Sequence, residues 1–261
     1  MFSDAVVSYR KLGMSGPAIR QLLAIRDQLR KATADMRQVN RKFPAMVEAH
    51  LGAAYLRTRE FSKAHDAFAS AIAGTNDRAT MLEFLFTEYK SQRAEKHLVA
   101  LLQEAADDGP GQGIVHAYMA EALSERLGNQ IAAAAAYRRA IVLDPTRSEY
   151  YNGLGLALYR QMDLSAALTE FTRATEIDPG DAAARYNEAC ALALLGRKDE
   201  ALYSLREAIQ LEPRLSEQAR VDKDFKSMNS LTGFQELIAA EVNDNMDRAT
   251  ASTVKTSDDE D

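Results

Sequence analysis

The sequence has a single cysteine, Cys190, and no tryptophan among its 261 residues. One thiol cannot form a disulfide within the chain, and chains without disulfides are typical of reducing compartments. Glycine (13), proline (6) and aromatic residues (7%) are also scarce, although 46% of the residues are hydrophobic. Alanine is abundant instead. This composition favours an ordered core of closely packed helices, since alanine has the highest helix propensity.

Long apolar runs are missing as well. No stretch of about 18 apolar residues occurs, so we expect no membrane-spanning helix. The opening residues, MFSDAVVSYRKLGMSG, lack the apolar centre of a secretory signal. Because they are mildly basic, a mitochondrial or other organellar location is the alternative to the cytoplasm, which we expect by default.

Groups that could carry catalysis are few and scattered. Cys190 has no histidine near it in sequence, so we expect a structural thiol. The loop GPGQG at 109–113 lacks the lysine and the hydroxyl residue of a phosphate-binding loop. The histidines form no i, i+4 pair that could bind a metal: they are His50, His65, His97 and His116. We therefore expect no enzymatic activity, no cofactor and no metal.

Charge is distributed unevenly along the chain, whose net charge is −6. Residues 1–44 carry nine Lys/Arg against three Asp, a balance of +6, and residues 241–261 carry seven acids against two bases, a balance of −5. A basic start and an acidic end can each contact other surfaces. We hypothesise that the acidic tail, residues 243–261, transiently covers a basic surface of the chain and competes with an acidic partner.

An internal repeat organises the middle of the chain. Asp144-Pro145, Asp178-Pro179 and Glu212-Pro213 follow one another at intervals of 34 residues. Each interval holds two amphipathic helical stretches with a short turn between them. Proline cannot continue a helix, so it ends every second helix at the same place.

Further positions recur within units that start at Ile114, Ser148 and Ala182. All three have alanine at positions 20 and 27 and a large apolar residue at position 24, namely Tyr137, Phe171 and Leu205. This pattern resembles the tetratricopeptide repeat, which is marked by an aromatic at position 4, Leu-Gly at 7–8, and Ala, aromatic, Ala and Pro at 20, 24, 27 and 32. The unit at Ser148 matches best, through Tyr151, Leu154, Gly155, Ala167, Phe171, Ala174 and Pro179.

The resemblance implies an all-α, right-handed superhelical solenoid of about five helical hairpins with capping helices at the ends. The five units are 45–78, 79–113, 114–147, 148–181 and 182–215. We expect capping helices over 216–242 and an acidic disordered tail over 243–261. The pattern is broken where Arg185 replaces the usual aromatic and Glu188 the usual leucine, and where Glu121 replaces glycine.

Residues 1–44 are expected to contain one long amphipathic helix, from Ser15 to Phe43, that ends at Pro44. Its apolar or small residues have the 3-4 spacing of a coiled-coil seam: Leu22, Ile25, Leu29, Ala32, Met36, Val39 and Phe43. Two interpretations stay open. The helix covers the exposed face of the first repeat, or it associates with a second copy of the chain.

The resemblance also implies a binding surface. In the family, the first helices of the repeats line a concave groove, and tyrosine and arginine are the residues that most often dominate interface energy. The positions carried over to this sequence are Arg57, Tyr118, Arg126, Asn152, Tyr159, Arg160 and Tyr186.

The sequence therefore predicts a non-catalytic scaffold or adaptor that binds a peptide or helix of a protein partner, with an acidic partner fitting the arginines. The first alternative is a structural protein that assembles into homo-oligomers through its N-terminal helix or groove. The second alternative is a protein that is tethered to an anionic surface or to nucleic acid through its basic N-terminal helix. We do not expect nucleic acid, because the basic residues are spread around the helix without aromatic residues between them.

Overall fold

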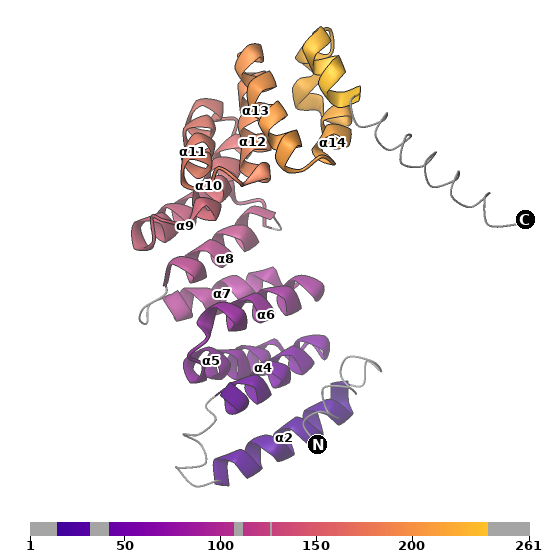
Figure 1. Ribbon diagram of the computed structural model, residues 1–261. Coiled ribbons are helices and arrows are strands. Elements are labelled where there is room, and N and C mark those ends of the chain that lie inside the picture. Colours follow the sequence, from indigo (N-terminus) through magenta and orange to yellow (C-terminus); the bar gives the residue numbers. More distant parts are fainter. Residues whose placement is uncertain (1–14, 32–41, 107–111, 126, 240–261) are drawn as a thin grey trace, which may run out of the picture. The chain divides into compact units, whose positions relative to one another are not determined.

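The computed structural model describes residues 15–31, 42–106, 112–125 and 127–239 (Figure 1). The acidic tail and the segment before Ser15 lie outside the described residues. Residues 32–41 of the predicted N-terminal helix lie outside them as well. Every element of the described part is a helix, and it contains no strand. The all-α repeat fold predicted from the sequence is confirmed.

The chain divides into two compact units, Met1–Pro145 and Thr146–Asp261, here called the N-terminal and C-terminal units. The helices of the N-terminal unit are α2 (Ser15–Lys31), α4 (Lys42–Arg57), α5 (Phe61–Gly74), α6 (Arg78–Ser91), α7 (Glu95–Ala106), α8 (Gln112–Glu125) and α9 (Gln130–Leu143). Those of the C-terminal unit are α10 (Ser148–Arg160), α11 (Leu164–Ile177), α12 (Ala182–Leu194), α13 (Lys198–Leu211), α14 (Leu215–Val221) and the 3₁₀ helix η1 (Lys223–Met228), followed by a helical stretch over 232–239.

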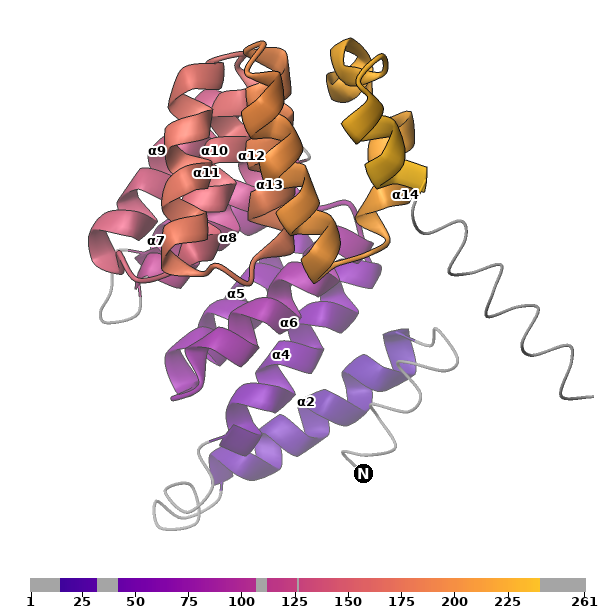
Figure 2. The ribbon, with the colours of Figure 1, turned by 45° about the horizontal axis from the view of Figure 1, so that its top comes forward.

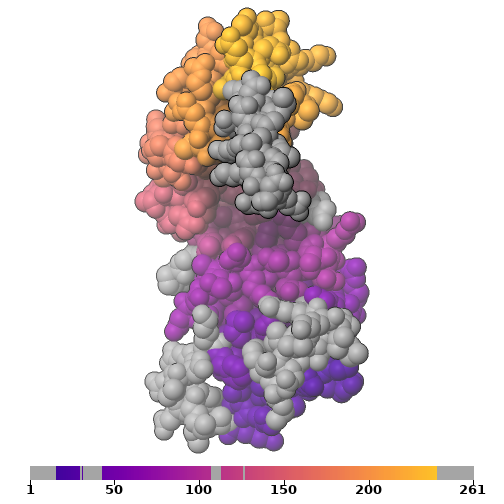
Figure 3. All heavy atoms as spheres, turned by 45° about the vertical axis from the view of Figure 1, so that its right-hand side comes forward, coloured from indigo at the N-terminus to yellow at the C-terminus, as the bar shows by residue number. Residues whose placement is uncertain are grey.

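Each repeat is one helical hairpin. The first helices are α4, α6, α8, α10 and α12, and the second helices are α5, α7, α9, α11 and α13. Within the N-terminal unit, α4, α6 and α8 lie side by side in one layer (Figures 1 and 2). The space-filling view shows side chains closing the gaps between the ribbons of α4 to α7 (Figure 3).

The hairpin turns and the ends of the repeats are set by single residues. At each turn one residue has a positive φ, and these residues are spaced by one repeat: Arg59 (62°), Arg93 (52°), Gly128 (63°), Met162 (64°) and Gly196 (77°). A residue other than glycine costs about 1–2 kcal/mol in this conformation. At the repeat ends, Asp144, Asp178 and Glu212 cap α9, α11 and α13 with extended backbone, because a following proline disfavours helical dihedrals.

The N-terminal helix packs within the chain. Helix α2 lies beside α4, with Ala18, Leu22 and Ile25 buried in the same core as the first repeats (Figure 2). The predicted boundary at Phe43 is corrected, because Phe43 lies in the first turn of α4. Pro44 is tolerated in the first turn of this helix, which begins at Lys42, because the first turn needs no donor from its backbone nitrogens. The described seam residues Leu22 and Ile25 thus pack against other helices of the same chain.

In two of the hairpins, the first and second helices pack closely at a glycine. An added Cβ at Gly52 would lie 2.7 Å from the ring of Phe68, and one at Gly155 would lie 2.5 Å from the ring of Phe171. Both phenylalanines are completely buried. Gly52 and Gly155 hold position 8 of their repeats and the rings hold position 24, so the two signature positions of the repeat meet face to face.

We expect Gly155→Ala to lower the free energy of unfolding by about 1–3 kcal/mol, the usual effect of overpacking a filled core. The better helix propensity of alanine offsets about 1 kcal/mol of the strain. Urea unfolding followed by circular dichroism measures the change. Gly16→Ala is the control, because the nearest side-chain atom to its added methyl is 4.0 Å away. Equal stabilities of the two variants would contradict the tight contact.

Candidate functional site

In the N-terminal unit the first-helix layer carries two of the predicted groove residues. Arg57 is exposed at the end of α4, and Tyr118 on α8 is half-buried with its ring centroid 5.1 Å from that of Phe86 on α6. Lys90 lies beside this pair, with its ammonium nitrogen 5.3 Å from the Phe86 ring centroid and 2.9 Å from a carboxylate oxygen of Glu125. This layer offers apolar rings bordered by charges.

Glu121, the residue that breaks the glycine position of the third repeat, belongs to the same surface. Its carboxylate oxygen is 3.6 Å from the Lys90 nitrogen. Burial raises the pKa of Glu121, and the neighbouring Glu125 adds to the rise. The hydrogen bond to Glu125 raises the pKa of Lys90, so the lysine remains charged. Arg126, the third predicted groove residue of this unit, lies outside the described residues.

In the C-terminal unit the chain's own C-terminal segment contacts the predicted tyrosines. The Tyr186 hydroxyl donates to the Asp222 carboxylate at 2.8 Å, and the Tyr159 hydroxyl donates to the Asp224 carboxylate. Tyr186 is only 4% exposed. Asp222 itself has extended backbone dihedrals, φ −74° and ψ 127°, and its second oxygen accepts from the Asp224 amide at 3.1 Å.

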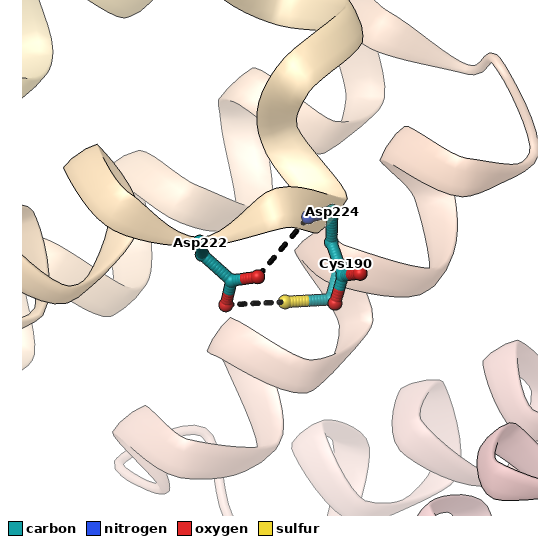
Figure 4. Close-up of side chains that lie close together, drawn as sticks. All are labelled: Cys190, Asp222 and Asp224. Atoms are coloured by element: carbon teal, nitrogen blue, oxygen red, sulfur yellow. Dashed lines mark hydrogen bonds between the residues drawn. The ribbon is translucent and has the colours of Figure 1, made fainter.

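Cys190 of α12 completes this cluster. Its sulfur lies 4.0 Å from the Asp222 carboxylate, and Figure 4 shows the thiol directed at that carboxylate. Burial, followed by the two nearby aspartates, raises the pKa of the Cys190 thiol well above its usual value. Burial is also the main reason that the pKa values of Tyr159 and Tyr186 are raised. All three groups therefore stay protonated and can act as donors.

A metal ion could in principle use Cys190, Asp222 and Asp224, because one ligand atom from each lies within 4.8 Å of the others. The hydrogen bonds within the cluster, however, already account for the positions of these side chains. Both carboxylates already accept hydrogen bonds from tyrosines. We interpret the cluster as an anchor for the C-terminal segment and derive no metal chemistry from it.

Apolar packing holds the same segment from the other side. Phe225, Met228 and Phe234 are completely buried, and the ring centroid of Phe225 lies 5.7 Å from those of Tyr186 and Phe234. The Lys198 ammonium donates to the Ser227 carbonyl at 2.7 Å. The end of the repeat stack is thus covered by α14, η1 and residues 232–239.

The remaining predicted residues lie on the same first helices. The Asn152 side-chain oxygen on α10 accepts from the Asn187 amide on α12 at 2.8 Å, and Arg160 is exposed at the end of α10. The structure therefore brings Asn152, Tyr159 and Tyr186 together in the C-terminal unit. Arg57 and Tyr118 lie in the N-terminal unit, on α4 and α8.

Comparison with known proteins agrees with this architecture. A family model described as "Tetratricopeptide repeat" matches residues 119–182 and 152–216. Among solved structures, the chain is similar to MamA, with 20% identity over 63% of this chain and 96% of that one at a TM-score of 0.50. It is also similar to a chain of the APC/C hetero-tetramer Cut9-Hcn1, with 16% identity over 82% of this chain and 43% of that one at a TM-score of 0.52.

At these identities the solved structures establish the fold alone. Within the described ranges, no helix has the length and apolar content needed to cross a bilayer. The family model shows tetratricopeptide repeats over residues 119–216, and the hairpins of α4 to α7 have the same helix-turn-helix form.

Proposed function

We propose that the protein is a non-catalytic interaction scaffold, which binds an extended acidic segment of a partner protein on the first helices of its repeats. The observation that carries this proposal is the seating of the chain's own C-terminal segment. Asp222 and Asp224 accept hydrogen bonds from Tyr186 and Tyr159, which project from the first helices α12 and α10. A first-helix layer of this protein thus already receives an acidic, partly extended segment.

The accessible part of the surface fits the same kind of ligand. Arg57 and Arg160 are exposed and hold equivalent positions, at the last residues of α4 and α10. Tyr118 supplies a half-buried ring beside Phe86. Exposed guanidinium groups bind carboxylates through paired hydrogen bonds, and partly buried tyrosines are frequent interface anchors. We place the partner against Arg57 and Tyr118 in the N-terminal unit and against Asn152 and Arg160 in the C-terminal unit. The predicted groove residues Tyr159 and Tyr186 are occupied by Asp224 and Asp222 of the chain itself.

A double variant tests this placement. Arg57→Glu combined with Tyr118→Ala should reduce the capture of a partner about thirty-fold, since truncating a hot-spot residue typically costs about 2 kcal/mol. Capture on the immobilised full chain, quantified by mass spectrometry, measures the loss. Circular dichroism checks that the helices remain.

The matched control changes a cation and an apolar residue on a second helix. Arg139→Glu combined with Ile131→Ala alters two exposed positions of α9, of which Ile131 is 75% exposed. This control should retain the partner. Equal capture by the folded groove variant, or an equal loss by the control, would refute the placement on the first helices.

The compartment is part of the proposal. We propose a reducing location such as the cytoplasm, supported by a free and buried Cys190 as the only thiol of the chain.

A further inference from the structure

The turns of the first two repeats carry arginine where glycine is favoured. Arg59 and Arg93 have φ values of 62° and 52°, whereas the matching residues of the third and fifth repeats are Gly128 and Gly196. A side chain in this conformation is strained, and such strain often accompanies a functional position. The strain alone identifies no ligand, but it directs attention to the surroundings of these two arginines.

Both arginines line one pocket of the N-terminal unit. It encloses about 400 Å³, and the residues that matter for its chemistry are Arg59, Phe61, Arg93, Glu95, Lys96 and His97. The rings of Phe61 and His97 stack with centroids 4.1 Å apart and an interplanar angle of 10°, and the Arg59 guanidinium lies 5.8 Å from the Phe61 centroid. We call it the turn pocket. It is formed at the hairpin turns and does not include Arg57 or Tyr118.

The cations of the turn pocket lack acidic partners. Arg59, Arg93 and Lys96 are exposed, and none of them forms an ion pair with a described residue. The one acid in the lining, Glu95, is 6% exposed. The pocket therefore presents three positive charges to solvent in a chain whose net charge is −6.

Basic residues near other hairpin turns have acidic partners. At the turn of the fifth repeat, the Arg197 guanidinium lies 2.6 Å from the Glu200 carboxylate. In the first turn of α5, the Lys63 ammonium lies 2.5 Å from the Glu60 carboxylate. No such acid pairs with Arg59, Arg93 or Lys96 among the described residues. Arg138 and Arg139 of α9 are also exposed and have no ion pair with a described residue, but only Arg59, Arg93 and Lys96 come together around one pocket.

We propose that the turn pocket is a second binding site, and that its ligand is a peptide segment of a protein partner with clustered negative charge. Two guanidinium groups can each form paired hydrogen bonds with a carboxylate or a phosphorylated side chain, and Lys96 adds a point charge. The stacked Phe61–His97 pair offers an aromatic surface for the rest of the segment. Three cations around one open pocket suit a short peptide, whereas nucleic acid is bound by a longer basic track.

The test uses the full chain and three labelled synthetic peptides of equal length. One carries four consecutive aspartates, the second replaces one aspartate with phosphoserine, and the third carries asparagines. Fluorescence anisotropy should show the two acidic peptides binding at least ten-fold more tightly than the neutral one, and more weakly as salt rises. A stronger response to phosphoserine would identify a phosphorylated partner, and equal responses a carboxylate-rich one.

The decisive variant is Arg59→Gly combined with Arg93→Gly. It removes two charges and relieves two strained backbone positions, so the protein should fold with an equal or higher melting temperature while acidic-peptide binding falls at least ten-fold. Arg138→Ala combined with Arg139→Ala removes the same charge from exposed positions of α9 and should change binding less than two-fold. The glycine variant keeps Arg57 and Tyr118 unchanged, so its loss of acidic-peptide binding is assigned to the turn pocket and not to the first-helix site.

Three outcomes would overturn the proposal. They are equal binding of the asparagine peptide, an equal loss in the α9 control, and undiminished binding in the folded glycine variant. A single-stranded oligonucleotide that binds more tightly than either acidic peptide would overturn the assignment of a protein partner.

Discussion

Replacing Phe225 with alanine is expected to lower the free energy of unfolding of the C-terminal unit by about 3–5 kcal/mol. The Phe225 ring is completely buried and contacts the rings of Tyr186 and Phe234. Its removal leaves a cavity between α12 and the C-terminal helices. Because these helices cover the last repeat, the surrounding side chains cannot collapse into the space without exposing that repeat.

Urea unfolding followed by circular dichroism gives the size of the loss. Val221→Ala is the control, because Val221 is 79% exposed in the same segment and should change stability by less than about 0.5 kcal/mol. Asp222→Asn combined with Asp224→Asn then weakens the hydrogen bonds to Tyr186, Tyr159, Cys190 and the Asp224 amide but leaves the apolar packing, and should have an intermediate effect. A loss below about 1 kcal/mol for Phe225→Ala would mean that the C-terminal segment is not part of the folded core.

The second large effect is expected at Arg185 and Glu188, which replace the usual aromatic and leucine of the repeat. Glu188 is 7% exposed. Its carboxylate accepts from Thr172 at 2.8 Å and from Ser204 at 3.1 Å, and lies 3.6 Å from the Arg185 guanidinium. The core of the fifth repeat thus holds a carboxylate surrounded by donors.

Glu188→Ala should cost about 3 kcal/mol, because it leaves a largely buried arginine without its countercharge. The Arg185 Nε is buried and already lacks a hydrogen-bond partner among the described residues. The combined change Arg185→Tyr and Glu188→Leu restores the family pattern. It should be neutral or stabilise the protein by about 1–4 kcal/mol, as apolar replacements of buried ion pairs often do.

The exposed pair Arg173–Glu176 provides the control. Its atoms are 2.8 Å apart, but both side chains are more than half exposed, so Glu176→Ala should cost no more than about 1 kcal/mol. The same urea measurement compares the variants. If Glu188→Ala costs no more stability than Glu176→Ala, the burial of Glu188 has no energetic consequence. If the variant with Arg185→Tyr and Glu188→Leu is less stable than Glu188→Ala, apolar residues cannot replace this ion pair.

The repeat architecture was predictable because its determinants are periodic. Gly155 and Phe171 lie at fixed positions of a 34-residue unit, and they meet in the structure as the repeat pattern implies. The proline positions likewise mark where α9, α11 and α13 end. Local sequence sufficed at these places, since each residue acts within its own hairpin.

Features that join distant segments could not be predicted in this way. Asp222 and Asp224 contact Tyr186 and Tyr159 across 36 and 65 residues, and no repeat spacing relates these positions. The tyrosines were expected on a binding surface, but nothing in the sequence indicated that the chain itself supplies carboxylates to them. Similarly, Arg59 and Arg93 have the same repeat position in sequence, yet only the structure shows their positive φ and shared pocket.

The anchor of the C-terminal segment also affects how the C-terminal unit opens. A stack of repeats can fray from its end one hairpin at a time, because each repeat contacts only its neighbours. Here Tyr186 of the fifth repeat and Tyr159 of the fourth both bind one short segment. The last hairpin cannot separate from the fourth repeat without breaking one of these two contacts. We therefore expect α10 to η1 to open more cooperatively than an uncapped stack, with similar free energies of hydrogen exchange for the amides of these helices.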